Sequence, residues 1–125
     1  MPRDVLIWER FITAHPAAFD AVAYDVPVGE GAAFDTTVNP DTGGNAEKLY
    51  KKKIDVVGSK GEVLYIIEVK PEAGPSALGQ IKANTLLFKR DHEPRQVVQA
   101  VIITDVLKPD MQYLAQEEGI NLIIA

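Results

Sequence analysis

The chain has 125 residues, 46% of them hydrophobic and 25% charged, which is typical of a globular protein with a core, so we expect one domain over residues 1–125. The absence of cysteine excludes disulfides, thiolate catalysis and thiolate zinc sites, and the net charge of −5 argues against a protein that coats nucleic acid non-specifically. No apolar stretch approaches the ~20 residues that span a bilayer and no secretory signal is recognisable, which predicts a cytoplasmic protein without a membrane partner.

The N-terminal part of the chain predicts a helix followed by a strand. Apolar residues recur at helical spacing from residue 4 toward residue 19, just after Pro2, and we expect this helix to end near His15. Apolar and polar residues then alternate over Ala21–Val28, as in a half-buried strand. Residues 29–46 carry many turn-forming residues and little apolar periodicity, which indicates either a functional loop or a poorly ordered connection.

Two further strands are predicted in the middle of the chain. Residues 50–57 and 63–70 are rich in β-branched and aromatic side chains, which favour strands. Residues 58–61 between them read Gly-Ser-Lys-Gly, a sequence typical of a hairpin turn. The two segments should therefore be antiparallel neighbours.

The second half of the chain predicts two helices, each followed by a strand. Ser76 is a candidate N-cap for a helix that extends to about Arg90, and the apolar segment Val97–Thr104 has the composition of a buried strand. A short helix over residues 109–118 and a last strand over Asn121–Ile124 complete the chain. The order α, β, β, β, α, β, α, β predicts the α/β class.

Three charged residues stand out at the ends of the two middle strands. Because side chains alternate along a strand, Glu68 and Lys70 should project from one face about 7 Å apart. In an antiparallel hairpin Asp55 lies beside Glu68 on the neighbouring strand, with its side chain on the same surface. Two carboxylates at that separation repel each other unless a cation lies between them.

A divalent cation would give these residues a chemical role. Magnesium prefers oxygen ligands, which Asp55, Glu68 and the backbone carbonyl of Val69 offer. It would activate a bound water and stabilise charge on a phosphate, while Lys70 orients the water or counters the developing charge. The alternative for Glu68 and Lys70 alone is an ordinary strand with a solvated charged face. Asp55 across a short turn, and a helix starting after Pro71 where a phosphate could lie, favour the site.

These residues resemble a known family. Ile54-Asp55, twelve intervening residues, Glu68-Val69-Lys70 and a following helix that bears Gln80 are similar to the PD-(D/E)XK nuclease superfamily. The resemblance covers residues 4–104 and implies an αβββαβ restriction-endonuclease-like core, with a mixed central sheet flanked by helices. The helix and strand at the C-terminus are additional to that core. It also implies that Asp55 and Glu68 bind the metal, Mg²⁺ or Mn²⁺, and that Lys70 assists catalysis.

The resemblance suggests two more site residues and leaves one departure. Many members carry a Glu on the first helix near the metal, which points to Glu9 as a ligand and catalytic residue, with Asp4 as the weaker choice. Some branches place a Gln, and a Tyr four residues later, on the helix that follows the Lys. Here Gln80 matches but Asn84 stands at the later position, which leaves the role of Gln80 open. The chain is also similar in its small size to Holliday-junction resolvases, although it lacks their strongly basic N-terminal segment.

The sequence therefore predicts a metal-dependent nuclease that hydrolyses DNA phosphodiester bonds endonucleolytically. Two alternatives remain open: a catalytically inactive nuclease-like module with a binding or structural role, and an accessory subunit that is active only with a partner. So small a core offers little surface to hold substrate, so a homodimer is also possible. Residues 109–125 would then add a strand to the sheet or form an interface.

Overall fold

A computed structural model describes residues 2–29 and 52–125. The predicted connection over residues 29–46, except Gly29, and the first two residues of the predicted strand 50–57 lie outside the described residues. The helices and strands are α1 (Arg3–Ala14), β1 (Ala21–Val28), β2 (Lys52–Lys60), β3 (Val63–Val69), α4 (Pro75–His92), β4 (Val97–Thr104), α5 (Met111–Glu117) and β5 (Asn121–Ile124). Their order agrees with the order that the sequence predicts.

The five strands form one mixed sheet in the order β1-β2-β3-β4-β5. β1, β2 and β3 are antiparallel neighbours, whereas β4 runs parallel to β3 and β5 runs parallel to β4. Parallel neighbours need a crossover, and the two helices α4 and α5 supply the two crossovers. This architecture confirms the predicted α/β class with a restriction-endonuclease-like core.

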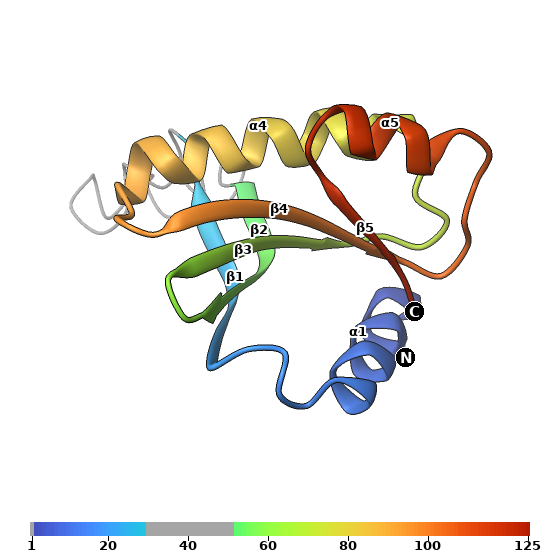
Figure 1. Ribbon diagram of the computed structural model, residues 1–125, viewed down its shortest axis with the longest axis horizontal. Coiled ribbons are helices and arrows are strands. Elements are labelled where there is room, and N and C mark those ends of the chain that lie inside the picture. The colour runs from blue at the N-terminus through green and yellow to red at the C-terminus, as the bar shows by residue number, and fades with distance from the viewer. Residues whose placement is uncertain (1, 30–51) are drawn as a thin grey trace, which may run out of the picture.

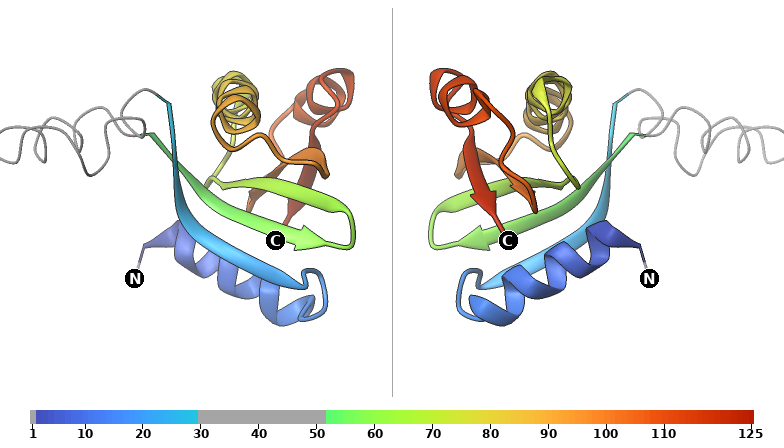
Figure 2. Two further views of the ribbon diagram at one scale, coloured as in Figure 1. Left: turned by 90° about the vertical axis from the view of Figure 1, so that its left-hand side faces the viewer. Right: turned by 90° about the vertical axis from the view of Figure 1, so that its right-hand side faces the viewer.

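Helices cover both faces of the sheet. Figures 1 and 2 show α4 and α5 on one face and α1 on the other. On the face of α4, Ile54, Ile66 and Ile102 pack with Ile81 and Phe88 of that helix. On the face of α1, a second apolar cluster joins Ile7 and Phe11 to the opposite side of β2, β3 and β4. The sheet is therefore buried on both sides, which explains the nearly continuous apolar composition of β3 and β4.

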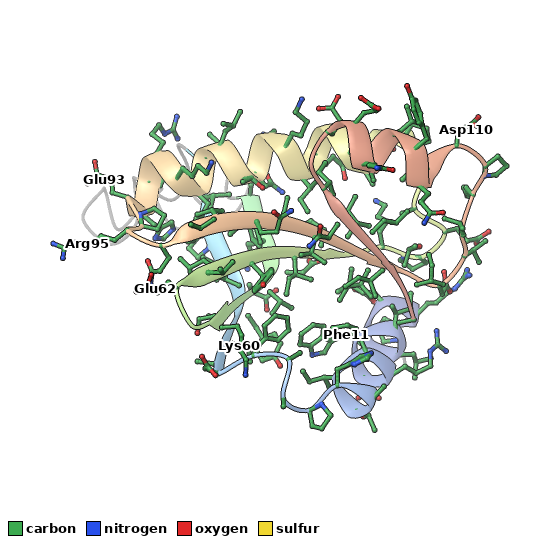
Figure 3. The ribbon with its side chains drawn as sticks, in the orientation of Figure 1. Phe11, Lys60, Glu62, Glu93, Arg95 and Asp110 are labelled. Atoms are coloured by element: carbon green, nitrogen blue, oxygen red, sulfur yellow. The ribbon has the colours of Figure 1, made fainter. Side chains whose placement is uncertain are left out.

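α1 is held to the sheet by an apolar stripe and by aromatic packing. Ile7 and Phe11 are buried, and Figure 3 shows Phe11 on the side of the helix that faces the sheet. Trp8 is half-buried and packs against the rings of Phe19 and Tyr24, with its indole N–H donating to the Tyr24 hydroxyl at 3.3 Å. The helical spacing of apolar residues predicts that one side of α1 is buried, but it does not predict the contacts of Trp8 with Phe19 and Tyr24.

The hairpin between β2 and β3 corrects the predicted turn. Residues 58–60 belong to β2, and Lys60 pairs with Val63, so only Gly61 and Glu62 form the loop, with Gly61 at φ 58°. Gly58 is needed for a different reason. A Cβ atom built there would lie 2.6 Å from Phe19 Cδ1, because the Phe19 ring packs directly over the strand.

The turn from β3 into α4 is fastened to the end of β4. The N–H groups of Lys70, Glu72 and Ala73 donate respectively to the Ile103 carbonyl, the Asp105 carboxylate and the Thr104 hydroxyl, each at 2.9 Å. From α1, Arg3 also pairs with the carboxylates of Glu72 and Asp105. The predicted N-cap Ser76 is wrong: Gly74 holds that position, and Pro75, which needs no N–H partner, begins the helix.

No helix within the described ranges is both long enough and apolar enough to cross a membrane.

Candidate functional site

Asp55 and Glu68 come together across β2 and β3. Val56 of β2 pairs with Ile67 of β3, so Asp55 and Glu68 lie opposite each other at the next position along the two strands. The regular pairing stops there, and Asp55 Oδ2 accepts a hydrogen bond from the Val69 N–H at 2.9 Å. A side-chain oxygen thus takes the place of a backbone carbonyl, so the strand itself fixes the Asp55 carboxylate.

A local irregularity turns Asp55 toward β3. In β2 the buried Ile54 packs on the face of α4, whereas Val56, two residues later, packs on the face of α1. Regular alternation would place both on the same face, so the alternation shifts at Asp55. In the neighbouring β1, Asp25 has a left-handed φ of 53° and lies between the residues paired with Val56 and Ile54. Both strands therefore depart from regular geometry beside the candidate site.

Glu68 lies on the face of the sheet that α4 covers. Its side chain is half-buried, and Asn84 Nδ2 on α4 donates to Glu68 Oε1 at 3.1 Å. Burial, and next the nearby negative charge of Asp55, raise the pKa of Glu68 to about 8, while the Asn84 hydrogen bond acts in the opposite direction. Without a cation, Glu68 therefore holds its proton at neutral pH.

The two carboxylates open into a cleft of about 440 Å³. It is lined by Arg3, Asp4, Asp55, Glu68, Val69, Lys70, Pro71, Ala77 and Gln80. Lys70 is exposed and has no ion-pair partner within the described part of the chain. Gln80 is exposed on the first turns of α4. Asp55, Glu68, Val69, Lys70 and Gln80 thus share the cleft, whereas Glu9 does not.

Glu9 lies elsewhere on α1, which corrects the first-helix prediction. It is exposed and lines a separate depression with Arg10, Ile124 and Ala125. The acidic residue of α1 that lines the cleft is Asp4, in the first turn of the helix. The reason is helix geometry: residues five apart point in directions about 140° different, so both cannot face the same place.

The donors of the cleft fit a hydrated divalent cation. Two neighbouring carboxylates, one of them with a raised pKa, offer the charge that such a cation neutralises, and the Val69 carbonyl is a further oxygen nearby. Across residues 2–29 and 52–125, however, no three His, Asp or Glu side chains stand close enough to bind one ion together. Asp4 therefore lines the cleft without completing such a group, and water or substrate would supply the other ligands of a cation.

Sequence reasoning missed the roles of two residues at this site. Asn84 is noted only as a departure from a family pattern, yet it contacts Glu68 directly. Asn84 follows Gln80 by four residues and so lies one turn along the same face of α4, which is the sequence feature that could have indicated its place near the site. Arg3 joins the first helix to both loops at the rim of the cleft, and nothing in the local sequence indicates those partners.

Comparisons with known proteins identify the fold but no family. No family model matches the chain, and no curated protein matches it. Three solved structures are similar: the protein of unknown function AF1548 (20% identity, TM-score 0.58), EndoMS in complex with double-stranded DNA (13%, 0.55) and protein VC1899 from Vibrio cholerae (17%, 0.51). The matches cover 93%, 97% and 96% of this chain but only 53%, 44% and 28% of the other chains. The chain thus has the fold of a part of each of these longer chains.

Proposed function

We propose that the chain is a nuclease that uses Mg²⁺ or Mn²⁺ to hydrolyse phosphodiester bonds in DNA. The observation that carries this proposal is the pair of Asp55 and Glu68 in one cleft, with Lys70, which forms no ion pair among residues 2–29 and 52–125, beside them. The fold gives additional support, because a similar chain, EndoMS, was solved in complex with double-stranded DNA. Binding of DNA by the present chain is part of the proposal.

Each residue of the cleft has a separate role in the proposed reaction. Asp55, Glu68 and the Val69 carbonyl would hold the cation, which when bound would supply an activated water and a positive charge for a phosphate oxygen. Lys70 orients that water and offsets the negative charge that develops on the phosphate. Gln80, exposed at the cleft, is placed to donate its amide N–H to a phosphate oxygen. The fixed carboxylate of Asp55 limits the reorganisation that binding requires.

A second candidate is a nuclease-like module that binds without cleaving. The absence of a third acidic or histidine ligand from the described residues favours this reading. It predicts DNA binding that neither magnesium nor the carboxylates change. The likeness to parts of longer chains leaves the activity of a whole protein as a proposal in either case.

A cleavage panel tests the proposed function. Linear duplex, closed circular, single-stranded and four-way-junction DNA are incubated with Mg²⁺, with Mn²⁺ or with a chelator. We expect cutting with either cation, none with chelator, and a loss of at least about a hundredfold in Asp55→Asn and Lys70→Ala. The control is Lys89→Ala, an exposed lysine of α4 that does not line the cleft. Undiminished cutting by Asp55→Asn and Lys70→Ala, or no cutting of any substrate by the wild type, would overturn the proposal, whereas linearised circles would establish endonucleolytic action.

A further inference from the structure

Asp105, the residue that follows β4, joins two other segments at the rim of the cleft. Its Oδ1 accepts a hydrogen bond from the Glu72 N–H at 2.9 Å, in the turn from β3 to α4. Its Oδ2 accepts from Nε of Arg3 in the first turn of α1, and Arg3 also donates to the Glu72 carboxylate. The Asp105 side chain is 11% exposed and does not line the cleft. One carboxylate outside the cleft thus holds together two segments that line it.

The turn that Asp105 holds has a strained backbone. Glu72 has a φ of 46°, in the left-handed region that costs a residue other than glycine about 1–2 kcal/mol. Such a conformation persists only where its surroundings fix it. Here the Glu72 N–H is bound by Asp105, and the next N–H, that of Ala73, is bound by the buried Thr104 hydroxyl. The Glu72 N–H lowers the pKa of Asp105 most and Arg3 lowers it further, so the acceptor is ionised at neutral pH.

This turn sets the position of the Lys70 backbone. On one side the Lys70 N–H donates to the Ile103 carbonyl at 2.9 Å, and on the other side Glu72 is fixed by Asp105. Pro71 lies between them, and its ring locks φ near about −65°, so few backbone torsions remain that could move the Lys70 Cα. Lys70 lines the cleft, and its long side chain starts from this fixed point. The reach of its ammonium group therefore depends on a carboxylate that lies outside the cleft.

We infer that Asp105 is a positioning residue for Lys70, because its carboxylate holds the turn that carries this lysine against the end of β4. The inference rests on the proposed function and adds to it a residue that acts without touching DNA. Mutation can separate the two contacts of the carboxylate. Asp105→Asn keeps an oxygen that accepts from the Glu72 N–H and loses the charge that pairs with Arg3, whereas Asp105→Ala and Asp105→Leu lose both.

A double-mutant cycle with Lys70→Ala tests the inference. DNA cleavage with Mg²⁺ is measured for the wild type and for the Ala, Leu and Asn variants of Asp105, each with and without Lys70→Ala. With Lys70 present, we expect the Ala and Leu variants to lower kcat by about tenfold or more with little change in KM, because Asp105 does not touch the substrate. With Lys70→Ala, the same variants should lower kcat by less than about threefold, because the residue through which they act is gone. Asp105→Asn should recover most of the loss, because it keeps the acceptor for the turn.

The control for charge is Glu117→Ala, which removes an exposed carboxylate of α5 that does not line the cleft and should keep the wild-type kcat. A second measurement needs no cleavage. The Glu72 amide should be protected from hydrogen exchange in the wild type and in Asp105→Asn, and an unprotected amide in the wild type overturns the inference even if neither the Ala nor the Leu variant folds.

Two kinetic outcomes also overturn the inference. Equal losses with and without Lys70 indicate a merely structural role for Asp105. An Asn variant as slow as the Leu variant shows that the contact with the turn is not what matters. No cutting by the wild type, or full cutting by Lys70→Ala, overturns the proposed function together with the inference. The two failures are thus distinguishable.

Discussion

The backbone N–H of Val69 donates to the carboxylate of Asp55 at 2.9 Å, so the acid of one strand is fixed by the backbone of the next. This bond has two parts that mutation can separate. The oxygen atom is an acceptor that completes the pairing of β2 with β3, and the negative charge is what a cation needs. An amide keeps the first and removes the second.

Asp55→Ala and Asp55→Asn should therefore differ in stability but not in cation binding. Asp55→Ala leaves the Val69 N–H without its acceptor and should be less stable than Asp55→Asn by about 1–2 kcal/mol. Both variants should lose Mg²⁺ binding. Urea denaturation in chelator gives the first comparison and calorimetry gives the second. Equal stability of the two variants would show that water satisfies the Val69 N–H equally well.

Glu68 should make the metal-free protein less stable as pH rises. Its folded pKa of about 8 lies above the usual glutamate value of 4.5, so the folded state binds the proton more tightly than the unfolded chain. Stability is then lost as pH rises from about 4.5 to about 8 and changes little outside that window. Glu68→Gln has no proton to lose and should gain on the wild type by about 2 kcal/mol between pH 5 and pH 8.5, with allowance for the partial exposure of Glu68. Denaturation of both proteins in chelator at the two pH values measures this gain, and a constant difference would contradict the raised pKa.

Two glycine substitutions should have opposite effects on stability. Gly58→Ala would place a Cβ atom 2.6 Å from Phe19 Cδ1 and should destabilise the protein by about 1–3 kcal/mol. Gly79 lies on the exposed face of α4, and a Cβ atom built there would have no other atom within 4 Å. Gly79→Ala should therefore stabilise the protein by about 0.5–1 kcal/mol. Thermal and urea denaturation measure both. A neutral Gly58→Ala would mean that the Phe19 ring moves aside without cost.

The two acids of α1 should differ in their effect on cleavage. Asp4 lines the cleft and Glu9 lines a separate depression, so Asp4→Asn should reduce cleavage more than Glu9→Gln does, by about tenfold. The charge change is the same in both variants, which controls for net charge. Initial rates at several Mg²⁺ concentrations make the comparison. The reverse order would restore Glu9 as the functional acid of the first helix.

Much of the fold was predictable because local pattern and tertiary structure agree. Ala21–Val28, Val97–Thr104 and Asn121–Ile124 match their predicted bounds, because each is a short apolar or alternating segment between clear turn residues. The predicted hairpin turn is too long because Gly58 has the residue type of a turn but belongs to β2. Its role instead is to admit the ring of Phe19, which only the packing of the 15–20 segment on the strand reveals.

The candidate site was predictable to the extent that it depends on strand pairing. Alternation and a short hairpin suffice to bring Asp55 beside Glu68, and the resemblance places Lys70 and Gln80 near them. The shift of alternation at Asp55 escapes such reasoning, because it depends on which helix covers Ile54 and which covers Val56. The contact of Asn84 with Glu68 likewise follows from the rotation of α4 over the sheet, which no local pattern specifies.

The cleft combines two fixed carboxylates with an ammonium that has no partner among the described residues. Asp55 and Glu68 are each tied to the protein, whereas the ammonium of Lys70 lies at the end of a long side chain with no partner among the described residues. A cation would then occupy one defined place, while the ammonium follows phosphates that arrive at different angles. Variation in backbone shape between duplex, junction and single strand would be absorbed by the rotamers of one lysine. The range of DNA shapes that the cleft accepts would consequently depend on Lys70. Replacing Lys70 with a shorter and stiffer basic side chain should reduce the number of DNA shapes that are cut before it abolishes cleavage.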